Sequence, residues 1–77
     1  MKAIQIKYLS ATNTKPARLK AWTSAGQIIV SVDNTIEINV NAEMLAIHYA
    51  EIKFGTPKIS GFGSLPNGDW CATFGDI

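Results

Sequence analysis

Several side chains able to bind a partner fall on one face of the first two predicted strands. Apolar residues alternate from Ala3 to Leu9 and again from Arg18 to Thr23, which is the period of strands buried on one side only. If both apolar rows face one core, the opposite face of this ribbon carries Gln5, Lys7, Arg18, Lys20 and Trp22. Cations bind phosphates, and Trp and Arg are frequent at the centres of protein interfaces. The ribbon, with Tyr8 nearby, therefore predicts a partner-binding surface.

The connection between these two strands extends the same surface. Residues 10–16 form a loop longer than most hairpin loops, rich in Ser, Thr and Asn side chains that stabilise turns. We expect Asn13 and Lys15 to take part in binding, with free backbone N–H groups forming an anion-binding nest beside Lys15 and Arg18. An ordinary solvated hairpin tip is the alternative, just as Trp22 could instead pack on its own sheet.

Catalytic chemistry has little support in this sequence. His48 is the single histidine, and we expect it on the solvent side of a helix, without the oriented partner that a general base needs. Cys71, the single cysteine, falls in a predicted strand without an activating base, and it permits no internal disulfide. No metal-ligand spacing, phosphate loop or dinucleotide-binding glycine pattern is present. We therefore expect no enzyme, no metal site and no cofactor.

The remaining elements complete a small sheet with one helix. Residues 27–32 predict a third strand, and residues 35–38 extend it or lead into the helix predicted for residues 39–54. Asn39 or Asn41 is the expected N-cap, Glu43 falls in the first turn, and Gly55 ends the helix. Its expected apolar face holds Ala42, Leu45, Ala46, Tyr49, Ala50 and Ile52, and its polar arc holds Asn41, Met44, His48 and Glu51. Met44 and His48 form a second candidate contact surface.

A second hairpin ends the chain. Residues 58–65 and 69–74 predict two strands joined by the turn signal Pro66-Asn67-Gly68-Asp69. Gly61 and Gly63 mark a bulge, a bend or the close approach of another backbone. The order β-β-β-α-β-β predicts an α+β fold, with a single antiparallel sheet of about five strands and one helix packed on one face, as one domain over residues 1–77.

Composition and charge limit the class of protein. The 77 residues are 47% hydrophobic and 17% charged, which is typical of one globular domain, and a homodimer would bury more of so small a core. Residues 1–32 contain five cations and no acid, whereas residues 33–77 hold all six acids. This asymmetry steers a charged partner, or it draws the two halves of the protein together. No apolar run suits a membrane helix and the opening resembles no signal peptide, so we expect a cytoplasmic protein.

Two segments, AIQIKYLSATNTKPARLKAW and GFGSLPNGDW, resemble a group of short proteins of phages, prophages and integrative elements. The resemblance implies a non-enzymatic accessory protein in the cytoplasm of a bacterial host. The leading hypothesis is a counter-defence protein, for example anti-CRISPR-like, or a host-takeover inhibitor that docks on a host protein or ribonucleoprotein. The second is a small nucleic-acid-binding protein that uses the basic ribbon, and the third is a sponge for nucleotide signals.

Overall fold

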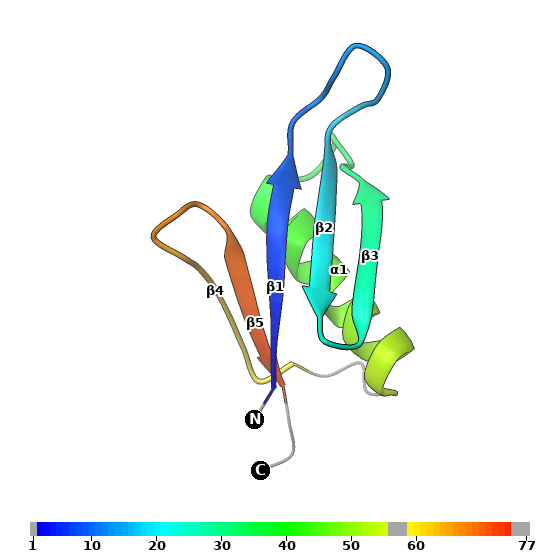
Figure 1. The fold of residues 1–77 in the computed structure, drawn as a ribbon. Coiled ribbons are helices and arrows are strands. Elements are labelled where there is room, and N and C mark those ends of the chain that lie inside the picture. The colour runs from blue at the N-terminus through cyan, green and yellow to red at the C-terminus, as the bar shows by residue number, and fades with distance from the viewer. Residues whose placement is uncertain (1, 56–58, 75–77) are drawn as a thin grey trace.

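The computed structural model describes residues 2–55 and 59–74 and contains one antiparallel sheet of five strands and one helix. The strand order is β3-β2-β1-β5-β4, so the first strand lies at the centre between the two hairpins (Figure 1). The elements are β1 (Lys2–Leu9), β2 (Arg18–Thr23), β3 (Gly26–Ser31), α1 (Ile38–Phe54), β4 (Gly61–Ser64) and β5 (Trp70–Phe74). The expected α+β fold, with its element order, is confirmed.

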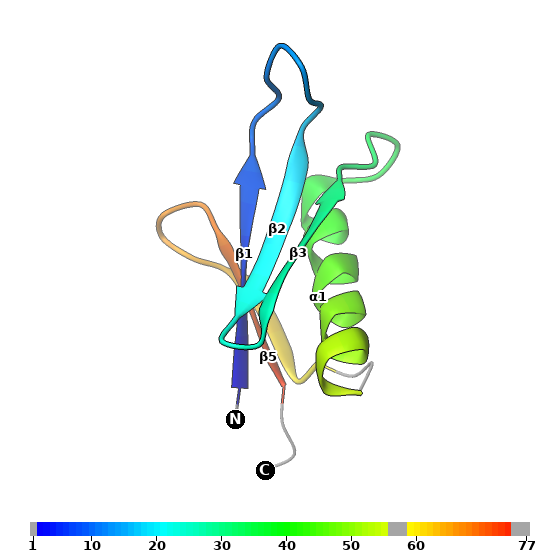
Figure 2. The ribbon, with the colours of Figure 1, turned by 45° about the vertical axis from the view of Figure 1, so that its right-hand side comes forward.

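The helix packs on one face of the sheet, and no helix or strand of the described residues covers the other face (Figure 2). The core between them contains the inward rows of three strands and the alanine-rich side of α1, whose small side chains let the helix lie close to the sheet. Its buried apolar residues are Ile4, Ile6, Leu19, Ala21, Ala42, Leu45, Ala46, Tyr49, Ala50, Trp70 and Ala72. Within residues 2–55 and 59–74, α1 is not long and apolar enough to cross a membrane.

The helix differs from expectation at its beginning and along one side. Its N-cap is Glu37, which makes no side-chain capping bond, so the expected cap at Asn39 or Asn41 is wrong. Glu43 lies beyond the first turn, which contains no acid. Ile52, expected on the apolar face, is 55% exposed. The C-terminus is as expected, because Gly55 takes the left-handed conformation (φ 73°) and its N–H donates to carbonyls of the last turn.

Asn41 is buried, contrary to its expected place on the polar arc. It is 8% exposed, and its Oδ1 accepts from the Asp33 N–H at 2.8 Å. Its Nδ2 donates to the carbonyls of Asp33 and Glu37, each at 3.0 Å, and to that of Ile36 at 3.3 Å. The amide thus satisfies the backbone of the connection between β3 and α1, which a helical wheel cannot reveal.

Tyr49 and Asn39 connect the helix to the sheet through their polar groups. The Tyr49 hydroxyl donates to the Gly26 carbonyl at 2.6 Å and lies 2.7 Å from the Thr23 hydroxyl, at the β2–β3 turn. Asn39, instead of capping the helix, accepts at 2.9 Å from the indole N–H of Trp70 on β5. These bonds fix α1 against both halves of the sheet.

The second hairpin forms with shorter strands than expected. β4 occupies only part of the predicted range 58–65, of which Lys58 lies outside the described residues, and Asp69 precedes β5. The turn signal is confirmed: the Gly68 N–H donates to the Leu65 carbonyl at 3.0 Å, and Gly68 has a φ of 92° that suits glycine. At Gly61 an added Cβ would lie 3.0 Å from Thr73 Oγ1, so a close cross-strand approach explains this glycine.

Candidate partner-binding surface

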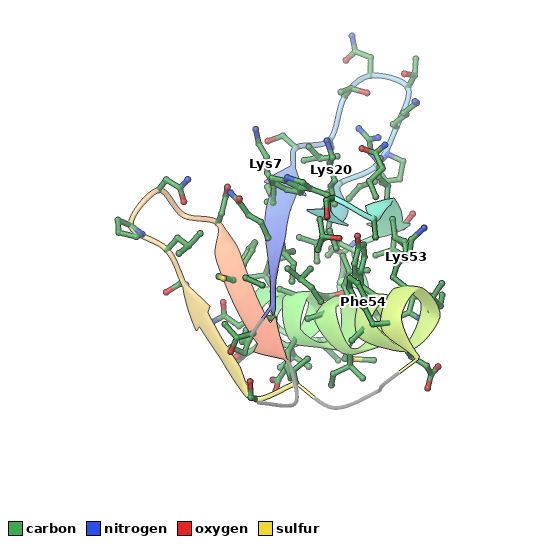
Figure 3. The ribbon with its side chains drawn as sticks, turned by 60° about the horizontal axis from the view of Figure 1, so that its bottom comes forward. Lys7, Lys20, Lys53 and Phe54 are labelled. Atoms are coloured by element: carbon green, nitrogen blue, oxygen red, sulfur yellow. The ribbon has the colours of Figure 1, made fainter. Side chains whose placement is uncertain are left out.

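The uncovered face of the sheet brings the predicted cations of β1 and β2 together. Lys7 lies directly opposite Lys20 in the register of the two strands, and Leu9 lies opposite Arg18 in the next outward-facing pair. Figure 3 shows Lys7 and Lys20 beside each other on the side of the sheet away from α1, whereas Lys53 lies at the far end of the helix. Within the part of the chain that the structure describes, no ion pair neutralises these cations. We call Lys7, Arg18, Lys20 and Trp22 the cationic face.

Trp22 lies on this face and is absent from the buried core. The Lys20 ammonium lies 5.1 Å from the centroid of the Trp22 ring. This is a cation–π contact between neighbours on the same side of β2. The indole is half-buried and lies opposite Gln5 on β1 and Gln27 on β3. The tryptophan therefore presents a partly covered ring, which suits an edge contact with a partner better than full intercalation.

Arg18 carries an unsatisfied donor. Its Nε is buried and has no hydrogen-bond partner among residues 2–55 and 59–74, although the side chain as a whole is only partly buried. A guanidinium N–H without a partner is costly, and carboxylate or phosphate oxygens are its best acceptors. Because this Nε is closed to solvent, a partner on the cationic face would reach Arg18 through the rest of its guanidinium group.

The loop from Ser10 to Pro16 is exposed throughout, with Asn13 and Lys15 among its side chains. The Thr12 N–H donates to the Lys15 carbonyl at 2.8 Å, while the N–H groups of Thr14 and Lys15 donate to Thr12 Oγ1. These amides hold the loop's own turn and are not free for an anion-binding nest. Asn13 and Lys15 present exposed side chains beyond the Arg18 end of the strands.

Two neighbours of the cationic face were not among the predicted site residues, although alternation in residues 27–32 already indicates that Ile29 points outward. Ile29 of β3 lies opposite Lys20 and is 42% exposed, which gives the face an apolar border. Asp69 approaches from the other side, where its Oδ2 accepts from Gln5 Nε2 at 3.2 Å. Both positions depend on strand order and register, for which alternation alone gives no signal.

Tyr8 lies away from the cationic face, contrary to its expected proximity. It belongs to the inward row of β1, one residue before the end of that strand, and is 44% exposed. There it lines a pocket of about 530 Å³ with Val32, Asn34, Ile36, Ile38, Gly68 and Trp70. The ring is thus separated from the lysines by the sheet itself.

Met44 and His48 are exposed, as expected, on the flank of α1 that faces β3. A pocket of about 310 Å³ separates the helix from the strand at this point, lined mainly by apolar side chains. Its lining comprises Val30, Ser31, Asp33, Ile36, Asn41, Met44, Leu45 and His48. This second surface therefore lies at an edge of the sheet, distinct from the cationic face.

The groups able to do chemistry do not converge. His48 lies on the helix, while Cys71 lies in the outward row of β5, on the opposite face of the sheet. Among residues 2–55 and 59–74, no cluster of three His, Cys, Asp or Glu side chains suits a metal ion. Hydrogen bonds from the Thr35 hydroxyl, and secondarily from its N–H, lower the pKa of Asp33, but this aspartate only stabilises its own turn.

Comparisons with protein-family models, with curated proteins and with solved structures find no significant match to this chain.

Proposed function

We propose that this chain is a non-enzymatic binding protein that docks on an anionic patch of a host protein or ribonucleoprotein through its cationic face. The observation that carries this proposal is the direct pairing of Lys7 with Lys20 on the uncovered side of the sheet. Like charges in opposite positions of neighbouring strands destabilise a sheet. The negative charge of an anionic partner offsets this repulsion. Binding therefore relieves a destabilisation that is present in the free protein.

The surroundings of the lysine pair favour a carboxylate-rich protein surface as the target. Arg18 adds a third cation on the same face, opposite Leu9, and Arg is suited to bidentate binding of carboxylates. Trp22 and Ile29 add apolar contact area around the cations, as in the centre of protein interfaces. The resemblance to short proteins of phages and integrative elements supports a counter-defence or host-takeover role, in which the bound partner is inhibited.

The test compares capture of host proteins by wild type, by Lys20→Glu and by Lys53→Glu. The two variants carry the same net charge, but Lys53 lies at the end of α1, away from the cationic face. We expect Lys20→Glu to reduce capture of the partner at least about tenfold and Lys53→Glu to retain it, since a charge reversal at an interface opposes the partner's field. Equal capture by wild type and Lys20→Glu would refute the proposal.

Nucleic acid is the second candidate, favoured by the same cations and by an aromatic ring beside them. Lys20 occupies one side of the Trp22 ring, so base stacking is restricted to the other side. Nuclease treatment of the lysate and a salt series separate the two candidates. Phosphate neutralisation predicts a steep linear fall of log affinity with log salt, whereas a protein interface centred on Trp22 is less sensitive.

A further inference from the structure

β3 is an exposed sheet edge without the usual protection against pairing. It is the terminal strand of the sheet, and its sequence from Gly26 to Ser31 contains neither charge nor proline. Edge strands normally carry lysine, proline or a bulge, or they are very short. The opposite edge, β4, does follow that rule, because it is only four residues long.

The free backbone groups of β3 belong to its odd-numbered residues. The Val32 N–H donates to the Ala17 carbonyl at 3.1 Å, just beyond the end of the β2–β3 ladder. Because the direction of these groups alternates along a strand, the even-numbered residues face β2. Gln27, Ile29 and Ser31 therefore direct their N–H and C=O groups away from the sheet.

This set of groups is complementary to itself. If a second copy of β3 pairs antiparallel about a two-fold axis at Ile29, then Ile29 lies opposite its own copy and Gln27 lies opposite Ser31. Every outward-directed residue then meets another outward-directed residue, as an antiparallel ladder requires. On the helix side of the sheet, the same register sets Ile28 against Val30, so the cross-strand pairs are apolar or neutral.

Exposed apolar side chains also lie beside this edge, on the flank of α1 that faces β3 and in the connection before the helix. Met44 is 57% exposed beside the pocket between β3 and α1, and Ile36 lines the same pocket. Ile52, whose exposure sequence patterns did not predict, lies one turn after His48 on the same flank. Figure 2 shows that β3 and α1 form this side of the molecule together.

We infer that the β3 edge and the adjoining flank of α1 form an interface with a second copy of this chain, making a two-fold dimer with a continuous sheet. Charge selects this edge over the cationic face, where Lys7, Arg18 and Lys20 would repel a second copy. The dimer covers Met44 and Ile36 and places two cationic faces on one continuous sheet surface. The dimer shares Ile29 with the border of the cationic face but uses none of its cations, so dimerisation and partner capture are measured separately.

The oligomeric state of the purified protein tests this inference directly. Analytical ultracentrifugation of wild type is expected to show a concentration-dependent dimer. Ile29→Lys sets two lysines opposite each other at the axis, and Met44→Lys charges the apolar flank, so each raises the dimer dissociation constant by about 30-fold or more. Val40→Lys is the matched control, because Val40 is 41% exposed on the flank that faces β4.

Cross-linking tests the register. In a Cys71→Ser background, Ile29→Cys is expected to form an intermolecular disulfide, since residues paired across a two-fold axis have Cα atoms about 5.5 Å apart. Gln27→Cys alone is expected to remain unlinked, and Gln27→Cys combined with Ser31→Cys to cross-link. These reactions leave the cationic face unchanged.

Three results would overturn the inference: a wild type that stays monomeric at about millimolar concentration, a dimer that Ile29→Lys leaves intact, or a dimer that cross-links through Gln27→Cys alone. Protection of the β3 amides against hydrogen exchange only after another protein is added would also overturn it, because a foreign strand would then be the occupant. Failure of partner capture by Lys20→Glu has no bearing on any of these readouts.

Discussion

Replacing Lys7 by Glu converts the repulsive pair on the cationic face into an attractive one. Lys7 is exposed, and its cross-strand neighbour is Lys20, so the substitution disturbs no buried contact. Lys7 is also preferable to Lys20 as the site of change, because Lys20 makes the cation–π contact with Trp22. We expect Lys7→Glu to be more stable than wild type and to bind the partner less well.

The magnitude follows from the geometry of an antiparallel pair. Cβ atoms of opposite residues are about 5 Å apart, and two long side chains splay their charges to roughly 7 Å. At that distance two unit charges in water interact by about 0.6 kcal/mol, so reversal of one sign changes the free energy of unfolding by about 1 kcal/mol at low ionic strength. Screening at 0.15 M salt reduces the gain to about 0.5 kcal/mol.

Urea denaturation of wild type, Lys7→Gln and Lys7→Glu at several salt concentrations measures this effect. We expect Lys7→Gln to give about half the gain of Lys7→Glu, and both gains to decline as salt rises. For a domain of this size, 1 kcal/mol corresponds to a shift of about 4–8 °C in melting temperature. A Lys7→Glu variant that is less stable than wild type at low salt would refute the interpretation that Lys7 and Lys20 repel each other. A gain in the free energy of unfolding that does not change with salt would refute it as well.

Three further predictions concern the polar groups that fix the helix and its entry. Asn41→Ala is expected to lower the free energy of unfolding by about 1–2 kcal/mol in urea denaturation, since it removes the acceptor of the Asp33 N–H and a side-chain donor to the carbonyls of the β3–α1 connection; an unchanged midpoint would contradict this role. Tyr49→Phe is expected to cost about 1–2 kcal/mol, with faster amide exchange in the β2–β3 hairpin, because the Gly26 carbonyl loses its donor. The pKa of Asp33 measured by NMR is expected below its ordinary value of 3.8 and, in Thr35→Val, closer to it. Because the folded-state pKa is lowered, the stability that Asp33 contributes is present above the unfolded-state pKa and is lost as pH falls through the folded-state value.

The local sequence pattern was sufficient to predict the helix and strands and the two faces of the first ribbon. Alternation in Ala3–Leu9 and Arg18–Thr23 placed Ile4, Ile6, Leu19 and Ala21 inward and the cations outward, because a side-chain period of two admits one buried face. The sequence also predicted the helix end at Gly55 and the turn at Asn67-Gly68. A positive φ depends on the type of one or two residues and requires no contact with a distant part of the chain.

Tertiary structure decided which groups face one another. The pairing of Lys7 with Lys20, the approach of Asp69 to Gln5 and the exposure of the β3 edge follow from strand order and register, which join residues far apart in the chain. Asn41 shows the same limit within the helix: its side chain is polar, so periodicity assigns it to solvent, yet the backbone of the preceding connection supplies all its hydrogen bonds. Burial of a polar group depends on partners brought by folding, and these are absent from any local pattern.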